Sequence, residues 1–130
     1  MLLDTSGLYC YFDKDDLFHA PAVEYFDASD SMLVNDYVLA EFIPLCHVRG
    51  LSRAKTLAFV EELLFSPFIE KIWTTEQDYL QALNLLKTRQ DKTYSLCDAV
   101  SFIIMRQRGI TESLTTDKHF EQEGFIRLLK

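Results

Sequence analysis

The sequence predicts an α/β fold with a mostly parallel central sheet, and three observations lead to it. Short apolar stretches of strand length alternate with longer segments of helical periodicity along the whole chain. Polar turn or capping residues close each of these segments. The chain has 130 residues, of which 48% are hydrophobic, and no internal repeat, which suits one core of ordinary size. We therefore expect residues 1–130 to form a single domain.

The expected elements follow from apolar spacing and from turn residues. Strands are expected at residues 2–3, 32–34, 68–73, 112–115 and 125–129. Helices are expected at residues 7–12, 18–26, 37–49, 51–65, 75–89, 94–108 and 118–123. The acidic stretch 13–16 is expected to face water, because short runs of charge usually do. Pro21 falls within the first turn of the second helix, and Pro44 is expected to kink the third.

Residues 94–108 form the most apolar helical segment, and its apolar residues cover more than half of the circumference. Neighbours on several sides are therefore expected to bury this helix. A carboxylate, Asp98, lies in its first turn. Ser95 and Asp98 have the spacing of a capping box, in which the acid satisfies backbone donors at the start of a helix. Taken alone, this pattern indicates a cap and nothing more.

Composition excludes several classes of protein. No run of about 18 uncharged apolar residues is present, so we expect no membrane span. The first residues lack a basic region and reach an acid at Asp4, which argues against a signal peptide and favours a cytoplasmic location. Cys10, Cys46 and Cys97 are odd in number and widely spaced, so we expect small core side chains rather than disulfides or a metal site.

The formal charge of −7 argues against a protein that coats nucleic acid through a basic surface. It does not exclude an enzyme that acts on nucleic acid. Carboxylates that hold divalent cations contribute to such a negative total, and the bound metals reverse the local field. Any contact with RNA or DNA is therefore expected to be local or metal-assisted.

Four acids lie where strands end or helices begin. Asp4 follows the first strand and Asp117 the fourth, Glu41 lies in the helix after the second strand, and Asp98 opens the central helix. In parallel α/β folds, ligands bind beyond the carboxyl ends of the strands. The four carboxylates are therefore expected to converge at one edge of the sheet.

Each acid also has a structural interpretation. Asp4 and Asp117 can cap the helices that follow them, as Asp98 can. Glu41 has apolar neighbours one turn before and after it, so it is expected to project along the apolar stripe of its helix, which is costly unless the acid is paired, protonated or bound to metal. Separate helix caps that happen to coincide explain the positions of these four acids less well than one shared site does.

Clustered carboxylates repel one another unless something neutralises them. Their oxygens suit Mg²⁺ or Mn²⁺, and the matching chemistry is metal-assisted hydrolysis of a phosphodiester. No phosphate-binding glycine loop, nucleophile elbow or HExxH motif is present. A nucleophilic route through Ser95 or Cys97 lacks a recognisable histidine base, because the three histidines show no pattern.

Several short stretches resemble the PIN-domain ribonucleases, especially the VapC-type toxins of prokaryotic toxin–antitoxin pairs. They are D-T-S near the start, V-L-A-E-F in the third helix, D-K-T-Y-S-L-C-D-A-V-S-F-I-I-M at the centre and L-T-T-D-K-H-F-E-Q-E-G-F-I-R-L-L at the end. The resemblance spans nearly the whole chain, through the order and spacing of these stretches. It implies that residues 1–130 are a single PIN-like nuclease domain, a three-layer α/β/α sandwich around a parallel sheet of four to five strands. It also implies Mg²⁺- or Mn²⁺-dependent cleavage of RNA, frequent homodimers and a cognate antitoxin partner.

The resemblance also assigns roles to residues. Asp4 and Asp98 match the principal metal-binding aspartates, Glu41 the acid of the helix after the second strand, and Asp117 the fourth, more variable acid. The supporting hydroxyl is matched by Thr115 or Thr116, and Ser6 matches a similar role. Asp91 occupies a position that is often acidic before the central helix, although a solvated loop residue explains it equally well.

Two alternatives stay open at this point. The first is a nuclease of the same fold with another nucleic-acid specificity. The second is a non-catalytic Mg²⁺-binding module, such as an acidic receiver-like α/β domain. A receiver needs a pair of acids after its first strand, and only Asp4 is found there, which disfavours this alternative.

Overall fold

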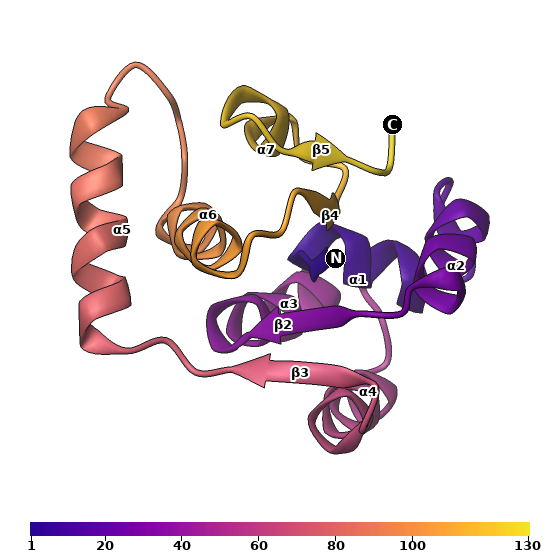
Figure 1. Ribbon diagram of the computed structural model, residues 1–130. Coiled ribbons are helices and arrows are strands. Elements are labelled where there is room, and N and C mark those ends of the chain that lie inside the picture. The colour runs from indigo at the N-terminus through magenta and orange to yellow at the C-terminus, as the bar shows by residue number, and fades with distance from the viewer.

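The computed structural model describes residues 1–130 and has at its centre a five-stranded sheet in the order β3-β2-β1-β4-β5 (Figure 1). The strands are β1 (Leu2–Leu3), β2 (Met32–Asn35), β3 (Ile69–Ile72), β4 (Glu112–Leu114) and β5 (Ile126–Arg127). All four pairings are parallel, and Leu2 in the central strand pairs with Leu33 on one side and Ser113 on the other. The expected parallel α/β sheet is confirmed.

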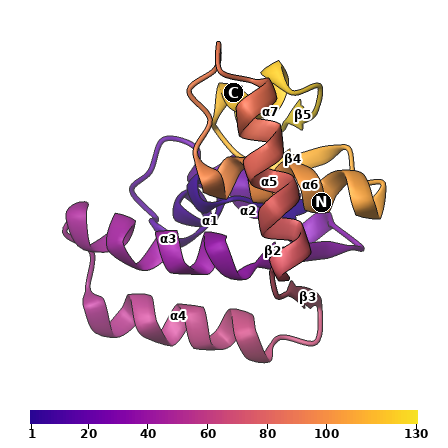
Figure 2. The same ribbon diagram turned by 90° about the vertical axis from the view of Figure 1, so that its left-hand side faces the viewer.

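Seven helices cover both faces of the sheet. They are α1 (Thr5–Phe12), α2 (His19–Ala28), α3 (Asp36–Val48), α4 (Arg53–Phe65), α5 (Glu76–Thr88), α6 (Leu96–Arg108) and α7 (Lys118–Gln122). Two hydrophobic clusters separate the faces, one shared by α1 to α4 and the other by α5 to α7. Figure 1 shows α5 and α6 on one side of the strands, and Figure 2 shows α3 and α4 lying side by side. The three-layer α/β/α arrangement is confirmed.

The two central strands β1 and β2 are buried on both faces, so successive residues serve opposite cores. Leu2 and Leu33 pack into the cluster with α5, α6 and α7, whereas Leu3 and Val34 pack into the cluster with α1 to α4. All four side chains are at most 3% exposed. This explains why β1 and the first three residues of β2 are continuously apolar rather than alternating.

Helix α6 has more buried residues than any other helix, as its composition predicted. Its buried residues include Phe102, Ile104 and Met105, each fully enclosed. Ser95 and Asp98 form the expected capping box at its start. Gly109 ends the helix in the left-handed conformation at φ 66°, which glycine adopts without steric cost.

The start of α1 differs from the sequence-based expectation. The helix begins at Thr5 rather than Gly7, because Asp4 already has the extended backbone of an N-cap and the polar Thr5 and Ser6 fit the first turn. Gly7 instead permits close packing: a Cβ there would lie 1.8 Å from the carbonyl oxygen of Leu114. The first turn of α1 can therefore lie directly against the end of β4.

The cysteines agree with a further expectation, since they are core side chains. Cys10, Cys46 and Cys97 are free and buried. No helix of the chain combines the length and the apolar character that crossing a membrane requires.

Candidate active site

Asp4 is a buried carboxylate directly beyond the end of β1, and its side chain is not a helix cap. The residue is 5% exposed, and its side chain makes no capping hydrogen bond to α1. Oδ2 accepts a 2.7 Å hydrogen bond from the Thr115 hydroxyl and a 3.1 Å hydrogen bond from the Ser6 hydroxyl. Burial raises the pKa of Asp4 to about 6, the Thr115 hydrogen bond opposes the shift, and the charge of Asp98 adds to it.

A hydroxyl network joins Asp4 to the segment after β4. The oxygens of Ser6 and Thr115 lie 3.1 Å apart, and Thr115 Oγ1 accepts the N–H of Asp117 at 3.0 Å. Thr116 takes part through its backbone, because its N–H donates to Ser6 Oγ at 3.0 Å. Of the two expected threonines, Thr115 therefore supplies the hydroxyl that contacts an acid.

Asp98 serves the helix cap and the acidic cluster together. Its Oδ2 accepts the Ser95 N–H at 3.0 Å, and its own N–H donates to Ser95 Oγ at 3.0 Å. The same Oδ2 lies 2.9 Å from Nδ1 of His119. These contacts fix the carboxylate and leave Oδ1 without a hydrogen-bond partner in the protein, so one oxygen remains available to a ligand.

Asp117 and His119 complete a group of possible ligand atoms with Asp98. Asp117 Oδ1 caps α7 by accepting the N–H of His119 at 2.9 Å, while Oδ2 lies 3.4 Å from His119 Nδ1. One ligand atom from each of the three residues lies within 4.8 Å of the others. The capping interpretation of Asp117 and its place in the cluster therefore both hold.

His119 is a member of the site that sequence reasoning missed. Its ring is held from the other side by Thr93, whose hydroxyl lies 3.1 Å from Nε2. A single histidine has no spacing pattern that marks it in a sequence. From the sequence, the histidines were considered only as a possible base for a Ser or Cys nucleophile, not as neighbours of the acids. The available signal was local: Asp117 caps α7 by accepting the backbone N–H of His119, which places the histidine beside the capping acid.

Glu41 lies at the edge of α3 and is exposed, so the expectation that it projects among apolar side chains is wrong. The buried stripe of α3 consists of Val38, Leu39, Phe42 and Cys46, and it is narrower than neighbour spacing suggested. The Glu41 carboxylate nevertheless lies near Asp4 and Asp98, since the charges of all three acids act on one thiol, that of Cys97. Burial raises the pKa of Cys97, and the charges of Glu41, Asp4 and Asp98 raise it further.

Asp91 is not brought together with the other acids. It lies in the turn before α6, its side chain is 72% exposed, and its one ion pair is with Lys92 at 3.3 Å. No hydrogen bond joins it to the acidic cluster. The placement matches a solvated loop residue.

The donor set fits a divalent cation. No lysine or arginine forms an ion pair with Asp4, Glu41, Asp98 or Asp117, and His119 is the only basic side chain within 4.0 Å of any of them. The raised pKa of Asp4 shows that burial beside Asp98 is costly for the ionised form. Carboxylate oxygens are hard ligands of the kind that Mg²⁺ and Mn²⁺ prefer. Here no lysine or arginine side chain neutralises them.

A model of the PIN domain family matches residues 1–125. This chain belongs to the PIN domain family of nucleases. Among curated proteins, it is 31% identical over 122 residues to ribonuclease VapC26 of Mycobacterium tuberculosis, covering 92% of this chain and 89% of that protein. It is 26% identical over 129 residues to the 23S rRNA-specific endonuclease VapC20 of the same organism, covering 98% and 97%. The resemblance to PIN-domain ribonucleases of the VapC type is thereby confirmed.

Solved structures agree with this assignment. The crystal structure of M. tuberculosis VapC20, described as a sarcin-ricin loop cleaving toxin, superimposes with a TM-score of 0.91 at 25% identity and covers 99% of this chain and 98% of that one. FitAcB from Neisseria gonorrhoeae has a TM-score of 0.66 at 18% identity, covering 97% and 94%, and supports the fold alone.

Proposed function

We propose that this chain is a Mg²⁺- or Mn²⁺-dependent endoribonuclease and the toxin of a type II toxin–antitoxin pair. Asp4, Glu41, Asp98 and Asp117 are its proposed metal-binding acids, and residues 1–130 act as one nuclease domain. The observation that carries the proposal is the buried Asp4 carboxylate, which has a raised pKa, lies beside Asp98 and lacks a cationic partner. Such a residue costs stability unless a cation neutralises it.

In this proposal Asp4 and Asp98 hold the cation, with Glu41 and Asp117 completing the shell or orienting the attacking water. When bound, Mg²⁺ or Mn²⁺ would lower the pKa of a water molecule and offset the charge of the phosphate. Thr115 and Ser6 keep Asp4 ionised and oriented, since both donate to one of its oxygens. Water adds to phosphorus, the bond to the 3′ oxygen breaks, and that oxygen takes a proton, which leaves a 5′-phosphate and a 3′-hydroxyl.

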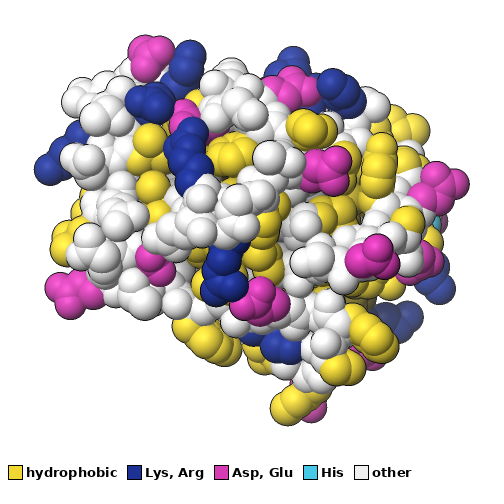
Figure 3. Space-filling view, in the orientation of Figure 1, with side chains coloured by type: hydrophobic (Ala, Val, Ile, Leu, Met, Phe, Trp, Pro, Cys, Tyr) yellow, Lys and Arg dark blue, Asp and Glu magenta, His cyan; other side chains and the backbone are white.

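RNA is the proposed substrate on the strength of the VapC relatives. The face shown in Figure 3 has no uniform basic surface for general binding, because its Lys and Arg side chains are interspersed with acidic ones, and the chain carries a formal charge of −7. Binding is therefore local to the site and depends on the cation. We place the reaction in the cytoplasm, where the RNA is.

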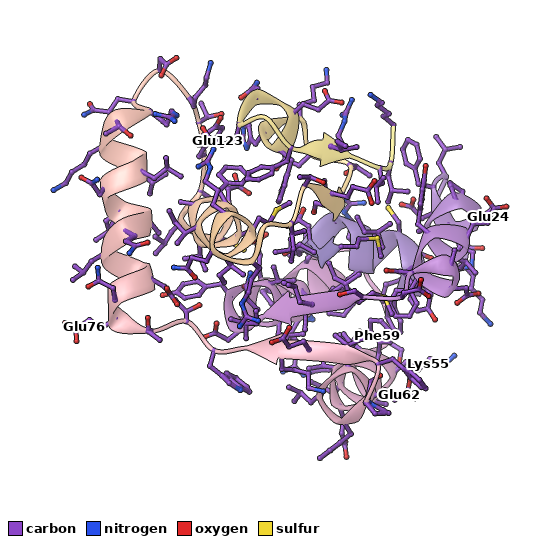
Figure 4. All side chains as sticks on the ribbon, in the orientation of Figure 1. Glu24, Lys55, Phe59, Glu62, Glu76 and Glu123 are labelled. Carbon is purple, nitrogen blue, oxygen red and sulfur yellow. The ribbon has the colours of Figure 1, made fainter.

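The proposed antitoxin lies in a groove between α2 and α4. This groove has a volume of about 630 Å³, with Phe26 and Phe59 among its apolar lining residues and Lys14, Lys55 and Glu62 as charged ones. Figure 4 labels Lys55, Phe59 and Glu62 along α4. An amphipathic helix suits such a groove. We further propose a homodimer, for which the exposed Leu80 and Leu83 of α5 and the exposed Trp73 before it are candidate contacts.

The test of the proposed activity is cleavage of labelled RNA in Mn²⁺, in Mg²⁺ and in EDTA, with wild type, Asp98→Asn and Asp78→Asn. Asp78 is a matched control because it forms the same capping box with Thr75 at the start of α5. We expect metal-dependent cutting that falls by more than about 100-fold in Asp98→Asn. Asp78→Asn should cut like wild type. Equal cutting by Asp98→Asn and wild type would refute the proposed site.

A further inference from the structure

A second cavity, which the metal site does not use, begins beside Asp4. It has a volume of about 240 Å³ and lies between α1, the Asp13–Phe18 turn and the end of α3. Ser6 and Thr116 line one end of it. Ser6 Oγ is 3.1 Å from Asp4 Oδ2, so an occupant of this end lies one side chain away from the acidic cluster.

Arg49 brings an unpaired cation to this cavity. Its guanidinium carbon lies 5.0 Å from the centroid of the Tyr9 ring, which holds the side chain over an aromatic face. The guanidinium forms no ion pair within 4.0 Å, and its polar contact is with the Tyr9 side chain, at the exposed end of α3. Most of its fork of N–H donors is therefore held in place and available to a ligand.

Asp16 supplies an acceptor in the same cavity. Its Oδ1 accepts the N–H of Phe18 at 2.8 Å, and the carboxylate also contacts the Cys10 thiol, so it is held in place while keeping acceptor capacity for a ligand. Asp13 and Arg49 both act on Tyr9, and Asp16 and Arg49 both act on Cys10, so a doubly charged phosphate would meet repulsion from these acids. A neutral ligand that offers both acceptor and donor groups avoids this repulsion.

The rest of the cavity is apolar. Leu17, Phe18 and Leu45 contribute to its lining, and Leu17 is 88% exposed at its rim. A cavity of this size is smaller than the pockets that bind drug-sized ligands, and it suits one flat heterocycle. An exposed leucine and a phenylalanine give the faces of an unstacked base an apolar contact.

We propose that this cavity is a base-recognition subsite that takes an unpaired guanine beside the cleaved bond of the RNA. Arg49 donates to the guanine carbonyl O6, and Asp16 accepts from N1–H and the N2 amine. Guanine is the base that places two adjacent N–H donors beside a carbonyl oxygen, so it matches the guanidinium and the carboxylate together. This inference rests on the proposed ribonuclease function and adds the determinant of its sequence preference.

The test is cleavage of an unstructured RNA pool of randomised sequence, with the 5′ ends of the products sequenced. Wild type should enrich guanine at one fixed position next to the cut. Arg49→Ala and Asp16→Asn should keep cutting but lose this enrichment by about tenfold. Arg53→Ala is the matched control, since it removes the same charge from an exposed position of α4 that does not line the cavity. Unchanged enrichment in Arg49→Ala and Asp16→Asn, or no guanine enrichment in wild type, overturns the proposal.

A binding measurement separates this inference from the activity itself. Asp98→Asn protein is titrated with a short fluorescent RNA that contains guanine, and with the same RNA carrying adenine there. We expect about tenfold tighter binding of the guanine oligonucleotide, and we expect Arg49→Ala to abolish the difference. Equal binding of both oligonucleotides refutes the subsite even if no RNA is cut. A further outcome is that Arg49→Ala leaves both the guanine enrichment at the cut and the tighter binding of the guanine oligonucleotide unchanged, and weakens antitoxin binding instead. In that case the cavity belongs to a protein interface and the proposal fails.

Discussion

Nδ1 of His119 lies 2.9 Å from Oδ2 of Asp98, which joins the first turn of α7 to the first turn of α6. The same carboxylate oxygen accepts the backbone N–H of Ser95. Two contacts from different directions thus hold one oxygen of Asp98 and leave the other free. We propose that His119 positions this acid.

Replacing His119 tests this role. His119→Ala should lower kcat by about 10- to 100-fold with little change in KM, because Asp98 loses a contact that orients it. His119→Asn keeps an N–H donor close to the position of Nδ1 and should recover part of the loss. His47→Ala is the control, since His47 is exposed on α3. Equal kcat values for His119→Ala and wild type would exclude a positioning role.

Asp4 should make the metal-free protein less stable as pH rises. Its pKa is raised from 3.8 to about 6, so between these values the folded state binds a proton that the unfolded state releases. The penalty is absent below the lower pKa and complete above the higher one. In EDTA near pH 7.5, Asp4→Asn should therefore raise the free energy of unfolding by about 3 kcal/mol, and the gain should vanish near about pH 4.

Urea denaturation at both pH values measures this difference. Asp15→Asn is the control, because Asp15 is exposed in the acidic turn. Mg²⁺ should stabilise wild type more than Asp4→Asn, since a bound cation removes the cost of the charge. A stability difference that does not depend on pH would contradict the buried, ionisable Asp4.

Glu123 is a buried acid whose function is structural. It is 9% exposed and pairs with Arg89 at 2.8 Å and with Arg106. Burial acts to raise the pKa of Glu123, but the hydrogen bonds and charges of the two arginines outweigh it and hold the pKa below its usual value. Its contribution to stability is therefore present above the unfolded pKa of about 4.5 and is lost as pH falls through the lower folded pKa.

Glu123→Gln should lower the free energy of unfolding by about 1–3 kcal/mol at neutral pH, since it weakens a partly exposed ion-pair cluster. Cleavage per folded molecule should not change. Glu76→Gln is the matched control, because Glu76 is exposed at the start of α5. Figure 4 labels Glu76 and Glu123 at separate places in the structure. Thermal unfolding at neutral and acidic pH would show the difference; a full loss of cleavage by folded Glu123→Gln would mean that the acid has a catalytic role.

The groove between α2 and α4 can be blocked without disturbing the core. Ala58 is exposed and lines the groove, so Ala58→Trp should fill it and weaken antitoxin binding by at least about tenfold. RNA cleavage should be retained and should resist the antitoxin. Ala54→Trp adds the same bulk one turn earlier on α4, outside the groove, and should behave like wild type. Normal inhibition of Ala58→Trp by the antitoxin would place the partner elsewhere.

The elements could be predicted because local physics determines them. Capping residues such as Asn35 and Ser52, and the closing Gly109, mark their helices directly. The order of the strands could not be derived in this way, since pairing Leu2 with Ser113 depends on contacts between distant residues that leave no local pattern. The rule that ligands bind beyond strand ends was enough to bring Asp4 and Asp98 together.

The parts of the site that sequence reasoning missed depend on side-chain direction. Glu41 was expected inside the apolar stripe, but helix periodicity does not locate the edge of the stripe to within one residue. His119 and Arg49 have no motif of their own. Each acquires its meaning from a partner, Asp98 or Tyr9, that only the folded chain brings near.

The hydrogen bond from Thr115 to Asp4 spans 111 residues of chain, so the acidic site is assembled only after nearly the whole chain has been made. A nascent chain carries Asp4 from the start, yet the central strand lacks its β4 neighbour and the cluster lacks Asp117 and His119 until that late segment emerges. A chain that ends before β4 should therefore leave the edge of β1 unpaired and the acids of the site apart.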